Sequence, residues 1–197
     1  MYFQYYMDSI HQKILIITAP SGAGKTSITR FLMEKMPVLS FSVSATTRNA
    51  RGNEKDGFDY YFISLEEFKS KIKHKEFAEW EMVYEGKYYG TLKSELKRIW
   101  SLHKVPVLDI DVKGAIHVQQ QYPENTLSVF VEPPSVEELK SRLESRGTES
   151  EESLQARVNK ASYEISFKNN FDVIILNDDL EKACNQAESV VLNFLNS

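Results

Sequence analysis

The chain reads Ile14-Leu15-Ile16-Ile17-Thr18 and then Ala19-Pro20-Ser21-Gly22-Ala23-Gly24-Lys25-Thr26, an apolar run followed by a glycine-rich turn. An amphipathic helical pattern begins at Lys25. Gly22 and Gly24 let backbone N–H groups turn inward around an anion, and the helix N-terminus adds the positive end of its dipole. A strand, a glycine turn and a helix in this order are the context that a phosphate-binding loop needs.

Two side chains of this turn carry chemistry. Lys25 would reach the β- and γ-phosphates of a nucleotide, and Thr26 would place its hydroxyl on Mg²⁺. The strict pattern has glycine where Ala19 stands, but alanine is small enough there if its φ is negative. The alternative interpretation is a glycine turn that only joins a strand to a helix.

The composition is that of an ordinary globular protein. The chain has 197 residues, 42% of them hydrophobic and 26% charged, which suits one compact domain with a sizeable core. These values exclude a disordered chain, a collagen and a disulfide scaffold. The net charge of −4 argues against a nucleic-acid binder that works by bulk charge, so an acidic substrate must be held by local positive charge.

Cysteine usage and hydropathy bear on the compartment. Cys184 is the single cysteine, so no intrachain disulfide can form and a reducing compartment is expected. No apolar run approaches the ~18 residues of a membrane span. The N-terminal residues 1–7 contain no basic region typical of a signal peptide. We therefore expect a cytoplasmic protein without a membrane partner.

Short β-rich runs alternate with helical stretches, which is typical of an α/β fold with a mainly parallel sheet. The expected strands are Ile14–Thr18, Ser40–Ser44, Val105–Asp111, Leu127–Val131 and Val173–Leu176. The expected helices are Lys25–Met36, Leu65–Lys75, Leu92–His103, Val136–Arg146, Glu151–Lys168 and Leu180–Phe194. Three helix starts carry a cap residue three positions before a glutamate, namely Ser64 with Glu67, Ser135 with Glu138, and Asp178 with Glu181.

Residues 48–90 interrupt this alternation, because they are rich in aromatic, glycine and charged residues. The short runs Asp59–Ile63 and Glu79–Tyr84 are expected to be antiparallel strands. We interpret the segment as a small insert over the edge of the sheet. A second polar stretch, Ser145–Ser153, separates two helices and is a candidate hinge or lid.

The insert contains residues suited to a second phosphate and a base. Arg48 and Arg51 follow a strand and can share one phosphate monoester, since arginine binds phosphate oxygens in a bidentate manner. Tyrosine hydroxyls, as on Tyr60 and Tyr89, also suit phosphate. The Glu79 carboxylate could accept the paired N–H donors that guanine presents and adenine does not. The alternative is a solvated hairpin surface.

Two aspartates, Asp109 and Asp111, end a strand, and a strand period of two would put both on one face. One could organise Mg²⁺ through water, and the other could bind nucleotide or orient Arg48. The alternative is a helix N-cap plus a solvated edge. The four histidines show no ligand spacing, so no structural metal is expected.

Three arginines flank the candidate lid. Arg142 and Arg146 are four residues apart on one helix, and Arg157 lies in the next helix. They could fold over phosphates, neutralise charge on the transferring group and exclude water. Alternatively they pair with neighbouring glutamates. Asn177 follows the last strand, where its amide could meet a purine edge.

The order of these pieces resembles the guanylate kinase family, from about Lys13 to the C-terminus. The segments that carry the resemblance are Ala19–Thr26, Phe41–Gly52, Glu79-Trp80, Tyr88–Gly90, Leu108–Gly114, Arg146–Glu149 and Asn177–Leu180. The resemblance implies an α/β P-loop kinase fold with a parallel five-stranded sheet flanked by helices, a small antiparallel GMP-binding insert and a helical lid. The implied boundaries are 1–41, 92–141 and 158–197 for the core, 42–91 for the insert and 142–157 for the lid.

The resemblance also implies a role for each matching residue. ATP would be bound by Ser21, Gly22, Ala23, Gly24, Lys25, Thr26, Ser27 and Asn177. GMP would be bound by Ser44, Arg48, Arg51, Tyr60, Glu79, Tyr89, Thr91 and Asp111. Catalysis would fall to Lys25, Arg48, Arg142, Arg146 and Arg157. Nucleotide-bound Mg²⁺ would be held by Thr26 and, through water, by Asp109.

The implied reaction is ATP + GMP → ADP + GDP with Mg²⁺, and dGMP is a further expected acceptor. ATP and GMP are the expected partners; no nucleic acid is expected, and the oligomeric state is open. One alternative is a non-catalytic binding module of the same family, against which the complete Gly-Lys-Thr loop argues. Another is a P-loop kinase with a different acceptor, against which Arg48, Arg51 and Glu79 argue.

Overall fold

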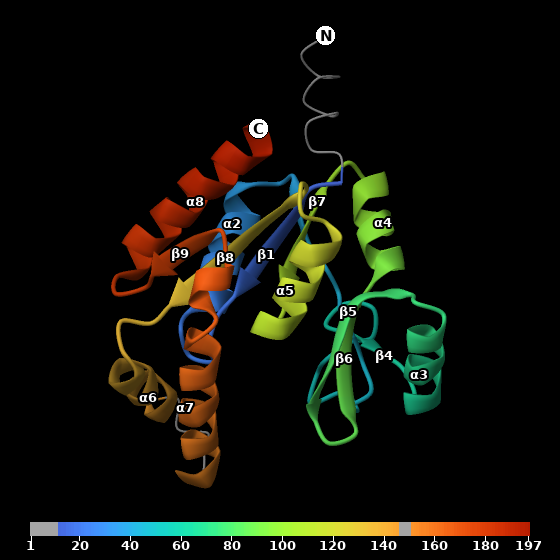
Figure 1. The fold of residues 1–197 in the computed structure, drawn as a ribbon, viewed down its shortest axis with the longest axis horizontal. Helices are drawn as coiled ribbons and strands as arrows, with labels where there is room; N and C mark the ends of the chain where they lie inside the picture. Colours follow the sequence, from blue (N-terminus) through green and yellow to red (C-terminus); the bar gives the residue numbers. More distant parts are fainter. Residues whose placement is uncertain (1–11, 146–150) are drawn as a thin grey trace.

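A parallel sheet of five strands forms the centre of the molecule, in the order β2-β7-β1-β8-β9 (Figure 1). The computed structural model describes residues 12–145 and 151–197. The strands of this sheet are β1 (Ile14–Thr18), β2 (Leu39–Phe41), β7 (Val105–Asp109), β8 (Thr126–Glu132) and β9 (Val173–Leu176). The parallel five-stranded sheet expected from the sequence is confirmed.

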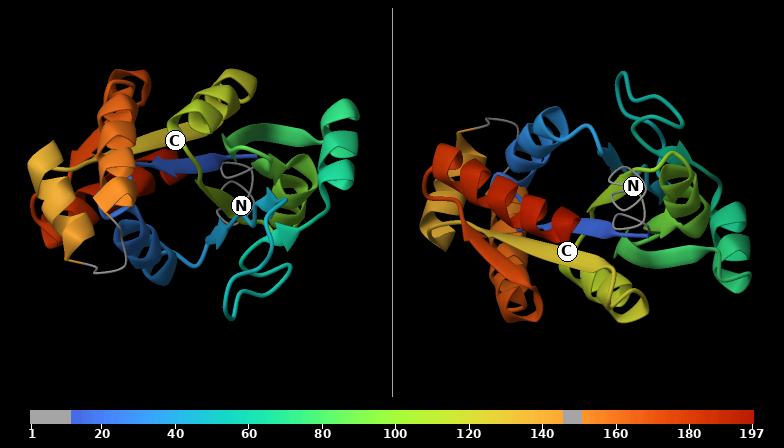
Figure 2. Two further views of the ribbon diagram at one scale, coloured as in Figure 1. Left: turned by 90° about the horizontal axis from the view of Figure 1, so that it is seen from below. Right: turned by 90° about the horizontal axis from the view of Figure 1, so that it is seen from above.

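Helices cover both faces of this sheet, as the edge-on views of Figure 2 show. Those that pack on it are α2 (Lys25–Lys35), α4 (Lys93–Ser101), α5 (Val112–Gln121), the C-terminal end of α7 (Glu151–Ile165) and α8 (Leu180–Asn196). Helix α6 (Val136–Glu144) packs on α7 instead. Every residue of β1 is fully buried. Leu15 and Ile17 pack with α2 and α8, whereas Ile14 and Ile16 pack with α4 and α5. A strand covered on both faces requires the continuous apolar run that the sequence contains.

A second, smaller sheet makes up the insert, which we define as β3 (Ala45–Thr46), β4 (Tyr61–Phe62), α3 (Leu65–Lys73), β5 (Phe77–Tyr84) and β6 (Lys87–Leu92). Its strand order is β4-β3-β6-β5. The insert has its own apolar cluster, in which Phe68 stacks on Phe77 with ring centroids 4.4 Å apart. Figure 1 shows the insert on one side of the molecule and α6 and α7 on the other.

The expected elements are present, with several differences. The strand expected to reach Ser44 ends at Phe41. The run expected to pair antiparallel around Tyr61 instead pairs parallel with β3. Strand β6 and helix α5 were not predicted. The α5 segment contains Gly114 and three glutamines, and the only start signal before it is Asp111, which the sequence analysis assigned to chemistry.

Two of the three expected helix caps are confirmed. The Ser64 hydroxyl accepts from the backbone N–H of Glu67, and the Ser135 hydroxyl accepts from that of Glu138. The third was wrong by one residue, because Asp179 rather than Asp178 accepts from the N–H of Lys182 at the start of α8. A short 3₁₀ turn, Lys168–Asn170, follows α7. Over the described residues, none of the helices combines the length and apolarity needed to cross a membrane.

Candidate functional site

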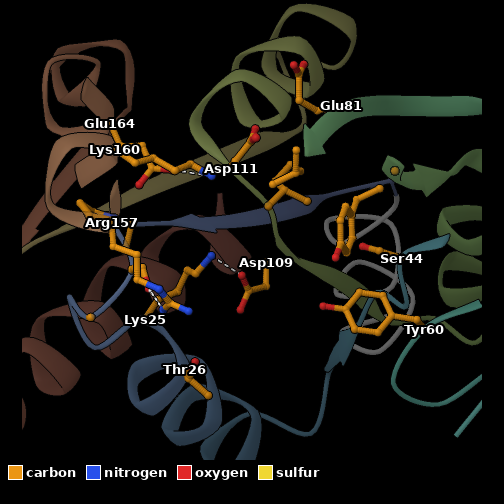
Figure 3. Close-up of a pocket in the computed structure, with 18 of the residues that line it drawn as sticks. Lys25, Thr26, Ser44, Tyr60, Glu81, Asp109, Asp111, Arg157, Lys160 and Glu164 are labelled. Carbon is orange, nitrogen blue, oxygen red and sulfur yellow. Dashed lines mark hydrogen bonds and ion pairs between the residues drawn. The ribbon is translucent and has the colours of Figure 1, made fainter. Parts of the chain in front are cut away.

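A cleft of about 700 Å³ lies where the carboxyl ends of β1 and β7 face the insert and α7 (Figure 3). Most of the predicted site residues line it. These are Ser21, Gly22, Gly24, Lys25, Thr26, Ser27, Ser44, Arg51, Tyr60, Glu79, Tyr89, Asp109, Asp111 and Arg157. The cleft therefore combines residues that are distant in the sequence, such as Ser21 and Arg157, which are 136 positions apart.

The glycine-rich turn forms the core side of the cleft. Gly22 and Gly24 have φ values of +95° and +96°, which residues with a Cβ rarely adopt. Helix α2 begins directly after Gly24, and no side chain caps its first turn. The turn and the helix start therefore offer backbone N–H groups and a positive dipole end to an anion.

Lys25 and Thr26 both line the cleft, and the Lys25 ammonium forms an ion pair with the Asp109 carboxylate (Figure 3). Asp109 is the last residue of β7. Asp111 lies beyond the strand and caps α5, where its Oδ1 accepts from the N–H of Gly114 at 2.8 Å. The strand-period argument for these two aspartates was therefore wrong, although both reach the cleft. The N-cap interpretation holds for Asp111.

Glu79 is the most strongly perturbed acid of the cleft wall. Glu79 lies on β5 and is 6% exposed. Its Oε1 accepts a hydrogen bond from the Thr91 hydroxyl at 2.7 Å. Burial raises the pKa of Glu79 to about 7; the charges of Asp111 and Glu81 act in the same direction, and the hydrogen bonds from Thr91 oppose it. Thr91 itself is buried behind Glu79 and does not line the cleft.

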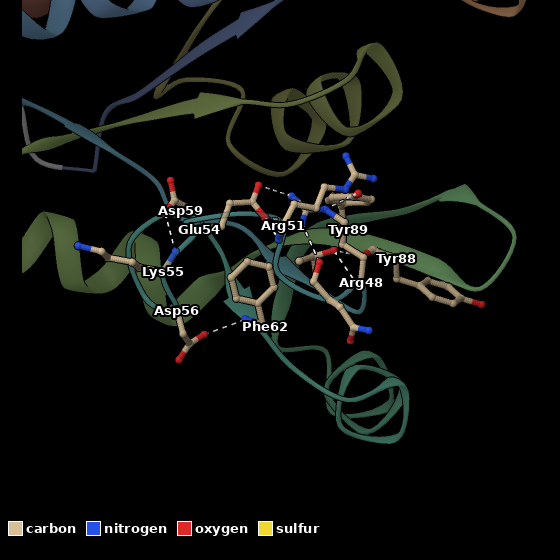
Figure 4. A network of polar contacts seen from close by, with 11 residues as sticks. Arg48, Arg51, Glu54, Lys55, Asp56, Asp59, Phe62, Tyr88 and Tyr89 are labelled. Carbon is tan, nitrogen blue, oxygen red and sulfur yellow. Dashed lines mark hydrogen bonds and ion pairs between the residues drawn. The ribbon is translucent and has the colours of Figure 1, made fainter. Parts of the chain in front are cut away.

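Arg48 is held by a network inside the insert (Figure 4). Its Nη1 and Nη2 donate to the two carboxylate oxygens of Glu54 at 2.6 and 2.8 Å, and its Nε donates to the Tyr89 hydroxyl at 3.1 Å. The hydrogen bond from Arg48, followed by that from the N–H of Arg51, lowers the pKa of Glu54 to about 2. The same contact with Glu54 raises the pKa of Arg48. Arg48 is 8% exposed and does not line the cleft.

The predicted lid arginines have different surroundings. Arg157 on α7 lines the cleft, and its Nη1 donates to the Ser21 hydroxyl at 3.0 Å. Arg142 on α6 does not line the cleft; its Nε donates to Glu138 and its Nη2 donates to the carbonyl of Asn177 at 3.2 Å. Arg146 lies outside the described residues.

Asn177 is packed beneath the phosphate-binding turn, in which Ala23 is buried. Asn177 is 4% exposed, and its Nδ2 donates to the carbonyl of Ala23 at 2.7 Å. The amide also lies so close to Gly24 that a side chain at Gly24 would collide with it. In this structure the amide therefore supports the turn from below.

Helix α7 contributes two cleft residues that the sequence analysis missed. Lys160 and Glu164 line the cleft with Arg157, and all three lie on one helix face because they are three and seven residues apart. Glu164 is 6% exposed, and burial raises its pKa. Helical spacing from Arg157 would have been enough to select both residues. The other charged residues of the cleft wall that were missed are Asp59, Glu81 and Lys87.

The comparisons with known proteins agree with this geometry. The guanylate kinase family model matches residues 11–193. Guanylate kinase of Bacteroides thetaiotaomicron is 43% identical over 98% of this chain and 95% of its own length. Guanylate kinase of Porphyromonas gingivalis is 47% identical over 93% of this chain and 98% of its own length.

Among solved structures, guanylate kinase from Anaplasma phagocytophilum is similar, with a TM-score of 0.72 and 30% sequence identity. That similarity covers 92% of this chain and 85% of the other. The match of family model, sequences and fold extends over nearly all of the chain, including the phosphate-binding turn, the insert and α7. The chain belongs to the guanylate kinase family.

Proposed function

We propose that the cleft transfers the terminal phosphoryl group of ATP to GMP, giving ADP and GDP, with dGMP as a second acceptor. One observation carries this proposal. The glycine-rich turn with Lys25 and the buried Glu79 carboxylate, contributed by the core and by the insert, line the same cleft. A phosphate-donor site and a guanine-selective group therefore face one another across one volume.

On the donor side, the turn and the start of α2 would hold the ATP phosphates through backbone N–H groups. Lys25 would bind the β- and γ-phosphates in place of its contact with Asp109. Ser21, Gly22, Ala23, Gly24 and Ser27 complete this part of the proposed ATP site. Asn177, which was expected to meet adenine, would act from beneath the turn through Ala23.

The donor set fits a nucleotide-bound Mg²⁺. Within the described residues there is no group of three or more His, Cys, Asp or Glu side chains arranged to hold a metal by itself. Mg²⁺ keeps several waters and is bound by substrate phosphates plus one or two protein oxygens. Thr26 and Asp109, both in the cleft wall, would supply those oxygens, and the ion would neutralise charge on the phosphates.

On the acceptor side, Glu79 would accept the N–H donors of guanine, with Thr91 fixing its carboxylate and Asp111 beside it. A site built to pair these donors discriminates strongly against a base without them, since its own buried polar group would be left unpaired. The GMP phosphate would meet Ser44, Arg51, Tyr60 and Tyr89, all of which line the cleft. Arg48 would support this group from behind.

The reaction needs positioning and charge neutralisation more than covalent chemistry. An oxygen of the GMP phosphate attacks the γ-phosphorus in line, and the bond to the β-phosphate bridging oxygen breaks. Arg157, already at the Ser21 end of the cleft, would stabilise the transferring group together with Arg142 and Arg146. Closure of an insert spanning 42–91 and a lid spanning 142–157 onto a core of 1–41, 92–141 and 158–197 would exclude water, the competing nucleophile.

The proposed location and substrates rest on the buried cysteine and on the residues that line the cleft. Cys184 is a free, buried thiol, which suits a reducing compartment, so the cytoplasm is the proposed location. ATP and GMP are the proposed partners. Neither the non-catalytic module nor a kinase with another acceptor is favoured, because Lys25, Arg51 and Glu79 all line the cleft.

An assay of ADP release tests the proposal. ATP and Mg²⁺ would be supplied with GMP, dGMP, AMP, CMP or UMP in turn. We expect turnover with GMP and weaker turnover with dGMP. Turnover with a different acceptor would contradict the role of Glu79, and a folded protein that binds GMP without any turnover would favour a binding module.

A further inference from the structure

Glu54 is a residue of the insert to which neither the sequence analysis nor the proposed reaction assigned a role. Both of its carboxylate oxygens are used. Oε1 accepts from Nη2 of Arg48 at 2.8 Å, and Oε2 accepts from Nη1 of Arg48 at 2.6 Å and from the backbone N–H of Arg51 at 2.8 Å (Figure 4). One carboxylate therefore orders the side chain of one proposed phosphate-binding arginine and the backbone of the other.

The orientation of Arg48 is almost fully determined by these contacts. An arginine has five N–H donors. Two are bound by Glu54, the Nε–H is bound by Tyr89, and a second Nη1–H is bound by the carbonyl of Asn49 at 2.9 Å. At least four of the five N–H groups are therefore used within the insert. The guanidinium carbon also stands 4.8 Å from the ring centroid of Tyr60.

The groups connected by this network share one location. Arg51, Tyr60 and Tyr89 line the cleft, whereas Arg48 and Glu54 do not. Glu54 is thus connected to Tyr89 and Tyr60 through Arg48. It is connected to Arg51 through the backbone N–H of Arg51. These three residues are three of the four cleft residues proposed to bind the GMP phosphate.

We propose that Glu54 is a positioning residue that holds the acceptor-phosphate site of the insert in its binding arrangement. This inference rests on the proposed function, since it takes the GMP phosphate as the ligand. Without the carboxylate, the buried Arg48 guanidinium would lose its bidentate partner and turn from Tyr60 and Tyr89. The backbone of Arg51 would lose its anchor at the same time.

The opposite role is an autoinhibitory one, in which the Glu54 carboxylate occupies the place of the phosphate and must leave before GMP binds. The two roles predict opposite signs. Loss of a positioning residue weakens GMP binding, and loss of a competing carboxylate tightens it.

The test is Glu54→Gln, with Glu54→Asp as a second variant that keeps the charge. Glu85→Gln is the matched control, because Glu85 is exposed in the turn between β5 and β6 of the same insert. Initial rates would give kcat and KM for each nucleotide. Calorimetry would give the Kd of GMP and of guanosine, which lacks the phosphate.

For Glu54→Gln we expect KM and Kd for GMP to rise by about 10- to 100-fold, the range that charge-assisted hydrogen bonds usually contribute. The Kd of guanosine and the KM of ATP should be unchanged, since the loss concerns only the acceptor phosphate. Glu54→Asp should lie between the parent and Glu54→Gln. In the Arg48→Ala variant, Glu54→Gln should raise the Kd of GMP by a much smaller factor than it does in the parent, because the two residues act as one unit.

Three results would overturn the proposal. Glu54→Gln could bind GMP more tightly than the parent, it could lose as much affinity for guanosine as for GMP, or it could lose no more affinity for GMP than Glu85→Gln does. Melting temperatures of all variants separate these results from unfolding. The parent measurements test the proposed function separately. A parent that binds GMP without turnover refutes the reaction but leaves the Glu54 comparison readable, and a parent that does not bind GMP refutes both.

Discussion

Gly114 in α5 lies directly against the Glu79 carboxylate of β5, so that a Cβ atom on residue 114 would stand 2.7 Å from Oε2 of Glu79. The core helix therefore approaches the insert closely at the carboxylate that we assign to guanine. Asp111, three residues earlier, receives the N–H of Gly114 and starts the same helix. The glycine thus has two local roles: it closes the N-terminal turn of α5 and leaves space for Glu79.

Gly114→Ala is expected to weaken GMP binding about tenfold while the KM of ATP stays unchanged. The added methyl group would push the carboxylate away from Thr91, since the contact is shorter than van der Waals distance. Steady-state kinetics with each nucleotide varied would measure the effect. Gln120→Ala, at an exposed position of the same helix, is the control. An equal rise in the KM of GMP and of ATP would argue against a specific contact with Glu79.

The affinity for guanine should depend on pH because burial raises the pKa of Glu79 to about 7. Guanine donors require the ionised carboxylate, so binding should tighten as pH rises from about 6 to 8. Guanosine is the suitable ligand, because the second ionisation of a phosphate monoester, near pH 6, would add to the GMP profile. Calorimetry at several pH values would give the curve. Glu79→Gln should flatten it, and an unchanged slope in that variant would assign the effect to another group.

Glu95 should be a strong contributor to stability, since it ties the core to the insert. It is 2% exposed and accepts from the N–H of Val43 at 3.1 Å, from the Tyr61 hydroxyl at 3.0 Å and from Arg98 at 2.8 Å. Burial alone would raise the pKa of Glu95, but the bonds from Arg98, Val43 and Tyr61 together lower it. A folded-state pKa below the unfolded value stabilises the protein above the unfolded pKa, and this stability is lost as pH falls through the folded pKa.

Glu95→Ala is expected to reduce the free energy of unfolding by about 3 kcal/mol at pH 7, because it removes the acceptor of the buried Val43 N–H, the half-buried Tyr61 hydroxyl and Arg98. Urea unfolding would measure the change, with the exposed Glu34→Ala on α2 as control. The difference between Glu95→Ala and the parent should shrink in acid. A difference that stays the same as pH falls from 7 to about 3 would contradict the ionised state assigned to Glu95.

Lys25→Ala is expected to abolish phosphoryl transfer, since Lys25 is the cleft lysine of the phosphate-binding turn. GMP binding should largely survive, because the residues assigned to GMP, apart from Asp111, belong to the insert and not to the phosphate-binding turn. The single-turnover rate and the Kd of GMP would be compared in the same preparation. Loss of GMP binding with the fold intact would contradict the separation of donor and acceptor sites.

The sequence was most informative where the relevant atoms are close along the chain. The turn before α2, the caps at Ser64 and Ser135, and the apolar run of β1 all follow from local spacing, because backbone geometry and helix starts depend on residues a few positions apart. The order of the motifs was specific enough to indicate the family. Helix α5 was missed because its N-cap residue, Asp111, was assigned to the nucleotide site and because Gly114 lowers the helix propensity of its first turn.

The tertiary structure alone decided which partner each polar group meets. Asn177 supports Ala23 across 154 residues, Glu95 holds Val43 across 52 residues, and β4 pairs parallel with β3. Even Arg48 and Glu54, six residues apart, could not be paired from spacing, because no regular element fixes the geometry of the loop between them. Local propensities determine which elements form, whereas hydrogen-bond partners depend on how those elements pack, and packing is a property of the whole chain.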